Sequence, residues 1–115
     1  MNVGMLYELL DRLPDACDGF VVRFTPIDRS GWLDPESYSV KHGALFFEDG
    51  TTGTICVAYM KDILDGMFNE QAVEREKIYP DMDVMIDFGE AYYRNPLRKR
   101  FEINWKRERV DVFVD

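Results

Sequence analysis

Apolar and polar residues alternate along several short stretches of the chain. The four clearest are 20–24, 84–88, 101–105 and 110–114. Such alternation predicts strands with one buried and one solvent-facing side, and it is typical of antiparallel sheets. The parity of the pattern changes between Trp105 and Val110. Since side chains on a strand alternate with period two, a turn or bulge is expected there.

Further strands are expected in the middle of the chain. Residues 38–47 predict a hairpin that turns at His42 and Gly43, because glycine accepts the positive φ of a tight turn. The apolar run 54–59 predicts another strand. His42 is the only imidazole and is compatible with a general base, but in a turn we expect it to be simply exposed.

Two stretches have helical spacing instead. Apolar residues recur every three or four positions over Met1–Leu13 and Met60–Phe68. Asn2 is expected to cap the first helix and Pro14 to end it. Asn69 is a candidate cap for a second helical piece after the second helix.

These elements predict a single α+β domain over residues 1–115. It has a mainly antiparallel sheet of about five to seven short strands, with two main helices packed on one face. The expected core residues are Phe20, Val22, Phe24, Ile55, Val57, Ile86, Ile103 and Val112.

The loop over residues 27–37 carries two further expectations. Asp34 and Pro35 have the order of a cap and first residue of a short helical turn. Trp32 is expected to fold over the core as a lid, because a buried aromatic ring pins such a loop.

Composition excludes several classes of protein. An apolar fraction of 46% and an aromatic fraction of 14% fit a folded domain rather than a disordered chain. No apolar run is long enough for a membrane span, and the N-terminus lacks the pattern of a signal peptide. Cys17 and Cys56 are the only thiols, too few with His42 for a structural zinc site. We therefore expect a reduced cytoplasmic protein, with no membrane association, cofactor or metal.

Motifs for nucleotide binding, metalloprotease or hydrolase chemistry are not found in the sequence, so no catalytic residues are assigned and a non-enzyme is expected. Asp81, Asp83 and Asp87 share one side of a predicted strand. They are compatible with a hard-cation site or an acid–base pair. The favoured interpretation is the solvated face of an edge strand.

Charge is unevenly distributed. The chain has 22 acidic and 14 basic residues and a net charge of −8. Residues 94–115 contain seven basic and four acidic side chains, whereas residues 1–93 contain seven basic and eighteen acidic ones. The basic end is compatible with nucleic-acid contact, but the negative field of the whole molecule opposes it. Pairing of Arg98–Arg100 with the aspartates of strand 81–90 is favoured instead.

The acidic excess favours a binding protein. The expectation is a small, non-catalytic inhibitor or immunity-type protein that docks a basic surface of a nucleic-acid-handling protein, as a nuclease inhibitor, phage anti-defence protein or DNA mimic. A phage or other oligomer-forming assembly protein is the alternative, and a small carboxylate-dependent enzyme ranks third. The expected partner-binding residues are Asp62, Asp65, Glu70, Glu74, Glu76, Asp81, Asp83 and Asp87.

Overall fold

The computed structural model describes residues 1–29, 31–50, 53–89, 93–94 and 96–114, with only the backbone for 93–94 and 96–99. Its helices and strands occur in the order α1 (Val3–Asp11), β1 (Val21–Pro26), β2 (Ser37–Lys41), β3 (Ala44–Glu48), α2 (Val57–Leu64), β4 (Asp83–Asp87), β5 (Tyr93–Arg94), β6 (Pro96–Asn104) and β7 (Arg109–Val114). Three short 3₁₀ turns, η1 (Asp15–Cys17), η2 (Asn69–Gln71) and η3 (Glu74–Glu76), lie between them. The predicted α+β class is confirmed.

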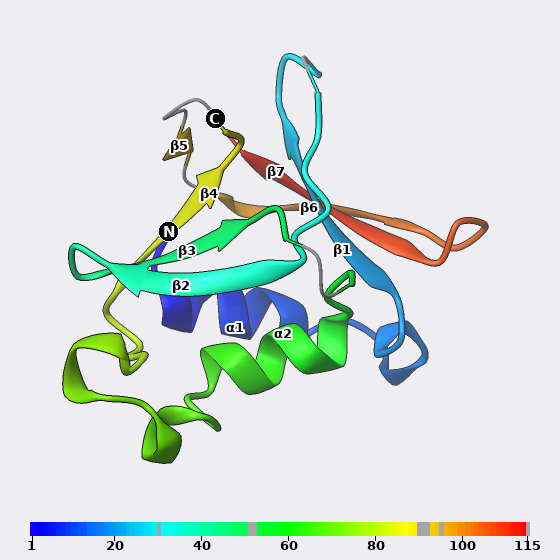
Figure 1. The fold of residues 1–115 in the computed structure, drawn as a ribbon. Coiled ribbons are helices and arrows are strands. Elements are labelled where there is room, and N and C mark those ends of the chain that lie inside the picture. The colour runs from blue at the N-terminus through cyan, green and yellow to red at the C-terminus, as the bar shows by residue number, and fades with distance from the viewer. Residues whose placement is uncertain (30, 51–52, 90–92, 95, 115) are drawn as a thin grey trace.

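The strands form two mixed sheets in place of the single sheet expected. One sheet has the order β1-β7-β6, and the other has the order β2-β3-β4-β5. β1 pairs with β7 and β3 with β4 in parallel, while the pairs β2–β3, β4–β5 and β6–β7 are antiparallel. The two helices run side by side beneath the strands (Figure 1). Parallel partners lie far apart in sequence, so alternation within a strand does not reveal them.

The core lies between the helices and the inner faces of the sheets. All the expected core residues are buried except Ile103, which is half-buried at the margin. No described polar or charged side chain is buried. No described helix has the length and apolar character that a membrane span requires.

The expected strand at 54–59 is wrong. α2 already begins at Val57, and only Ile55 and Cys56 are extended beside β1. The first helical amides find partners across the fold, because Val57 N–H donates to Phe20 O at 2.9 Å and Ala58 N–H to Asp18 O at 3.0 Å. These distant carbonyls satisfy the amides that every helix start leaves without a partner.

Asn2 caps α1 as expected, with its Oδ1 accepting from Met5 N–H at 2.9 Å. The hairpin turn is also confirmed, since His42 and Gly43 have φ values of 54° and 72°. The cap predicted at Asp34 is wrong. Its carboxylate instead accepts two hydrogen bonds from Arg23 of β1, at 2.7 and 3.0 Å.

The lid predicted at Trp32 is also wrong. Its side chain is 62% exposed, and the Arg23 guanidinium lies 4.8 Å from the centre of its ring. Leu33, the next residue, fills the core position and forms a bridge to Phe24 of β1. One apolar residue is enough to hold this loop on the core, so the indole is left outside.

Candidate protein-docking surface

α2 presents acidic residues to solvent. Asp62 lies on its outer face and Asp65 follows its last turn, and both line a hollow of about 260 Å³ together with Asp18. Lys61 is the basic residue in this hollow, and it forms an ion pair with Asp11 of α1 at 3.1 Å. The hydrogen bond that Lys61 donates to Asp11 raises the pKa of Lys61. Within the described part of the chain, neither Asp62 nor Asp65 forms an ion pair, so the hollow keeps a negative potential.

The segment after α2 turns back instead of continuing as a helix. Gly66 has a φ of 76°, a conformation that ends the helix and that other residues adopt at a cost. Asn69 then clamps the segment: its Nδ2 donates to Ile78 O and its Oδ1 accepts from Ile78 N–H, both at 2.8 Å. Asn69 therefore bridges two backbone stretches. The expectation that its side chain caps a second helical piece is wrong.

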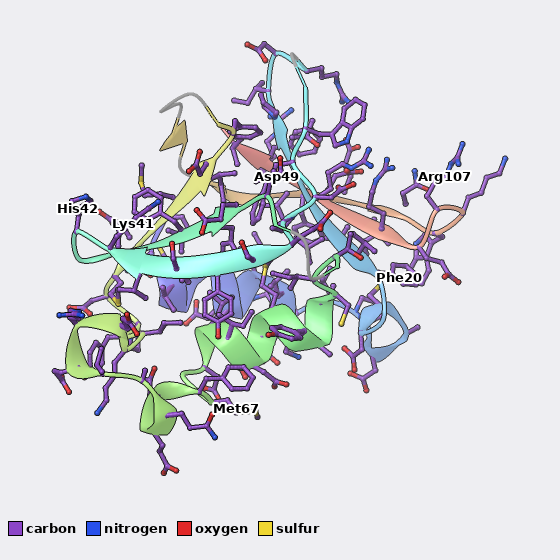
Figure 2. The ribbon with its side chains drawn as sticks, viewed as in Figure 1. Phe20, Lys41, His42, Asp49, Met67 and Arg107 are labelled. Atoms are coloured by element: carbon purple, nitrogen blue, oxygen red, sulfur yellow. The ribbon has the colours of Figure 1, made fainter. Side chains whose placement is uncertain are left out.

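Because α2 ends at Leu64, the apolar residues that follow it are not in the core. The sequence pattern placed Met67 and Phe68 on the buried stripe of a longer helix, but they are 59% and 37% exposed. In Figure 2, Met67 points outward below α2, at the periphery of the molecule. The rings of Phe68 and Tyr59 lie 6.0 Å apart, and Tyr59 is 46% exposed. An exposed aromatic pair therefore adjoins the carboxylates of α2.

A trough runs between β2 and this aromatic pair. It consists of two hollows, of about 450 and 360 Å³, that share Tyr38 of β2. The first is lined by Tyr38, Ser39, Val40, Phe68, Asn69, Gln71, Ala72, Glu76 and Ile78. The second is lined by Glu36, Ser37, Tyr38, Gly53, Thr54, Ile55 and Tyr59. We call the two together the β2 trough. Sequence reasoning missed it, because its walls come from three separate segments.

The acidic residues expected on the second helical region are only partly brought together. Glu70 and Glu74 lie in the separate turns η2 and η3, so the predicted shared helical face is wrong. Glu76 lines the β2 trough. Glu74 is engaged locally: Tyr79 Oη donates to it at 2.7 Å and Lys77 Nζ lies 3.2 Å away. The hydrogen bond from Tyr79 and, to a smaller extent, the interactions with Lys77 lower the pKa of Glu74.

The aspartates of β4 lie elsewhere. Val84 and Ile86 face the core, so Asp83 and Asp87 point to the opposite side of the sheet, away from the helices. β4 lies between β3 and β5 and is therefore not the edge strand that was expected. Asp81 is exposed ahead of the strand. No group of three possible metal ligands occurs among the residues that the structure describes.

The basic end of the chain divides between the two sheets. Arg94 of β5 pairs with Ile86 of β4, whereas β6, which contains residues 98–100, pairs with β7. The side chains of Arg98 and Lys99 lie outside the described residues, so the expected pairing of Arg98–Arg100 with the aspartates of strand 81–90 stays a prediction. Arg100 lies over the ring of Phe113, 5.3 Å from its centre. Arg107 lies at the tip of the β6–β7 hairpin, far from Met67 in Figure 2. Charge is thus segregated, with acidic residues around α2 and basic ones around this hairpin.

Comparisons with protein-family models, with curated proteins and with solved structures find no match to this chain. The assignment of function therefore depends on the surface itself.

Proposed function

We propose that this protein is a non-catalytic binding protein that docks a basic surface of a partner protein. The docking surface is the acidic side, which we define as residues 57–81. Six acidic and three basic side chains give this stretch a net charge of −3. The observation that supports the proposal most directly is the exposed pair Tyr59 and Phe68, which lies beside carboxylates that form no ion pairs in the described chain.

Such a combination fits what is known of protein interfaces in general. Aromatic residues supply most of the binding energy at the centre of an interface when water is excluded from them. Charges around the centre steer the partner and raise the association rate. Here Asp62 and Asp65 would act by steering, whereas Tyr59, Met67 and Phe68 would be covered by the partner.

The kind of partner follows from the sign of the charge. Proteins that handle nucleic acids carry basic surfaces that bind phosphates. A domain with an acidic, aromatic-bearing side is able to cover such a surface and exclude the nucleic acid. The proposed role is therefore that of an inhibitor of the immunity-type, anti-defence or DNA-mimic kind.

Two variants of equal net charge test this proposal. Asp62→Asn/Asp65→Asn removes charge from the acidic side, and Glu8→Gln/Glu102→Gln removes the same charge from exposed positions elsewhere. We expect only the first variant to lose capture of a nucleic-acid-handling protein from the source cell, measured by quantitative mass spectrometry against the unmodified protein. The association rate with that partner should fall as salt rises, since the Debye length shortens from about 10 Å at 0.1 M to about 3 Å at 1 M.

The opposite results would overturn the proposal. Equal capture by both variants would show that the acidic side is only a solvated surface. An association rate that does not change with salt would exclude electrostatic docking.

A further inference from the structure

β2 is an outer strand of its sheet, and its free edge faces the β2 trough. In the order β2-β3-β4-β5, β2 pairs only with β3. All five of its residues are half-buried, and in the described chain no backbone hydrogen bond joins Tyr38–Lys41 to any segment except β3. Figure 1 shows β2 at the front of the sheet with α2 below it. An edge of this kind is able to pair with another strand unless it is blocked.

The trough lies where a further strand would place its side chains. Tyr38 and Val40 pair with Phe47 and Leu45, which face the core, so they too point toward the helix layer. A strand added to the edge would lie roughly 4.8 Å from β2. Every second side chain of that strand would then point toward the exposed ring of Phe68 and its partner Tyr59.

Described residues of the chain adjoin this edge at both of its ends. The turn η3 packs against β2, and its residue Glu76 lines the hollow that also contains Val40. At the other end the lining includes Gly53 and Thr54, which are exposed. Tyr38, which both hollows share, lies between these two ends, and an incoming strand would pair with the edge there.

We propose that the occupant is an extended segment of the partner protein in which apolar and basic side chains alternate, bound to β2 by strand addition. This inference rests on the docking function proposed above and specifies how the partner is held. Backbone hydrogen bonds supply affinity in this mode, and the pockets for alternate side chains supply specificity. The carboxylate of Glu76 lines the trough and matches a basic segment.

A second copy of this chain fits the same edge less well. Two molecules joined edge to edge would bring two acidic troughs together, each on a protein with a net charge of −8. Like charges oppose such an approach. The negative charge of the protein therefore favours a basic partner segment over self-association.

Synthetic peptides test strand addition without altering the fold. The probe is a ten-residue peptide of alternating valine and lysine, made with backbone N-methyl groups on the valines or on the lysines. In an extended strand the N–H groups of every second residue point to the same neighbouring strand. N-methylation of one residue type therefore removes the hydrogen bonds to β2, and N-methylation of the other does not. The blocked form should bind about tenfold more weakly than the other. Amide shifts in NMR titrations should centre on Tyr38–Lys41. Phe68→Ala should weaken binding of the tighter-binding methylated form. In the same NMR titrations the amide of Phe113, on the other sheet, should not shift.

Each result decides between models. Equal binding of both methylated forms, with shifts at Asp62 and Asp65, would overturn strand addition and leave acidic docking intact. An alternating valine–glutamate peptide that binds as well as the lysine one would overturn the choice of a basic segment. No binding of any lysine peptide, together with unchanged capture by Asp62→Asn/Asp65→Asn, would overturn the docking function as well. A dimer in light scattering that is abolished by changes in β2 would assign the edge to a second copy.

Discussion

Replacing Asn69 by alanine removes the clamp that holds the wall of the β2 trough. The side-chain amide of Asn69 makes two hydrogen bonds, to the N–H and to the C=O of Ile78, both 2.8 Å long. Ile78 is only 5% exposed, so its peptide groups would find water with difficulty after the change. Both a donor and an acceptor would therefore lose their partner at once.

The magnitude follows from these two bonds. An intramolecular hydrogen bond contributes about 0.5–1.5 kcal/mol net, and more when a buried group is left without a partner. We expect Asn69→Ala to lower the free energy of unfolding by about 2–3 kcal/mol. For a domain of this size the corresponding fall in Tm is about 8–12 °C if the whole domain unfolds together. The turns η2 and η3 bury no residue, so part of the effect is expected as local opening of this segment.

Urea denaturation and hydrogen exchange at the Ile78 amide measure the two contributions. Gln71→Ala is the matched control, because Gln71 is exposed in the same turn and its loss should change stability by less than about 0.5 kcal/mol. If Asn69→Ala were no more destabilising than Gln71→Ala, and the Ile78 amide kept its protection, the clamp would not hold the segment and the reasoning would be refuted.

Three other predictions concern the core, the thiols and the 3₁₀ turns. Phe24→Ala should cost about 3–5 kcal/mol in urea denaturation, because this fully buried ring packs 5.8 Å from a second phenylalanine; a cost below 1 kcal/mol would contradict that packing. Cys17 is fully buried and burial raises its pKa, so a thiol reagent should modify half-buried Cys56 first; equal rates would refute this order. Tyr79→Phe should raise the pKa of Glu74 in an NMR titration, because it removes the hydrogen bond that chiefly lowers this pKa. Any stability from this bond is present at neutral pH and is lost as pH falls through the lowered pKa. An unchanged pKa of Glu74 would exclude the bond.

Strand prediction from the sequence worked where one side of each strand faces the core. The alternation at 20–24, 84–88 and 110–114 appears in the structure as β1, β4 and β7. Every second residue is buried in β1 and β4, and in β7 Phe113 is buried in addition to the three valines. The prediction of a strand at 54–59 failed because burial of Ile55 and Val57 is compatible with a strand and equally with an extended residue followed by the start of a helix. Two residues do not distinguish the two periods, and the carbonyls that receive the first helical amides lie far away in sequence.

The candidate surface was predictable only in its charge. The carboxylates of Asp62 and Asp65 were expected on one helical face, and the structure brings them into one hollow. The trough was not predictable, because it depends on α2 ending at Leu64 and on Asn69 turning the next segment toward β2. Both features depend on tertiary contacts. The helical spacing of apolar residues through Phe68 predicted instead that the helix continues past Leu64.

The parallel pairing of β1 with β7 has a consequence for how the chain folds. Val21 pairs with Arg109, so 88 positions of sequence separate the two partners. Closing a loop of this length costs about 4 kcal/mol of chain entropy beyond a constant, whereas the β2–β3 and β6–β7 hairpins close over short turns. The hairpins and helices are therefore expected to form early and β1 to join late. Until it does, the apolar side of β1 is open to other chains, and folding yield should depend on protein concentration.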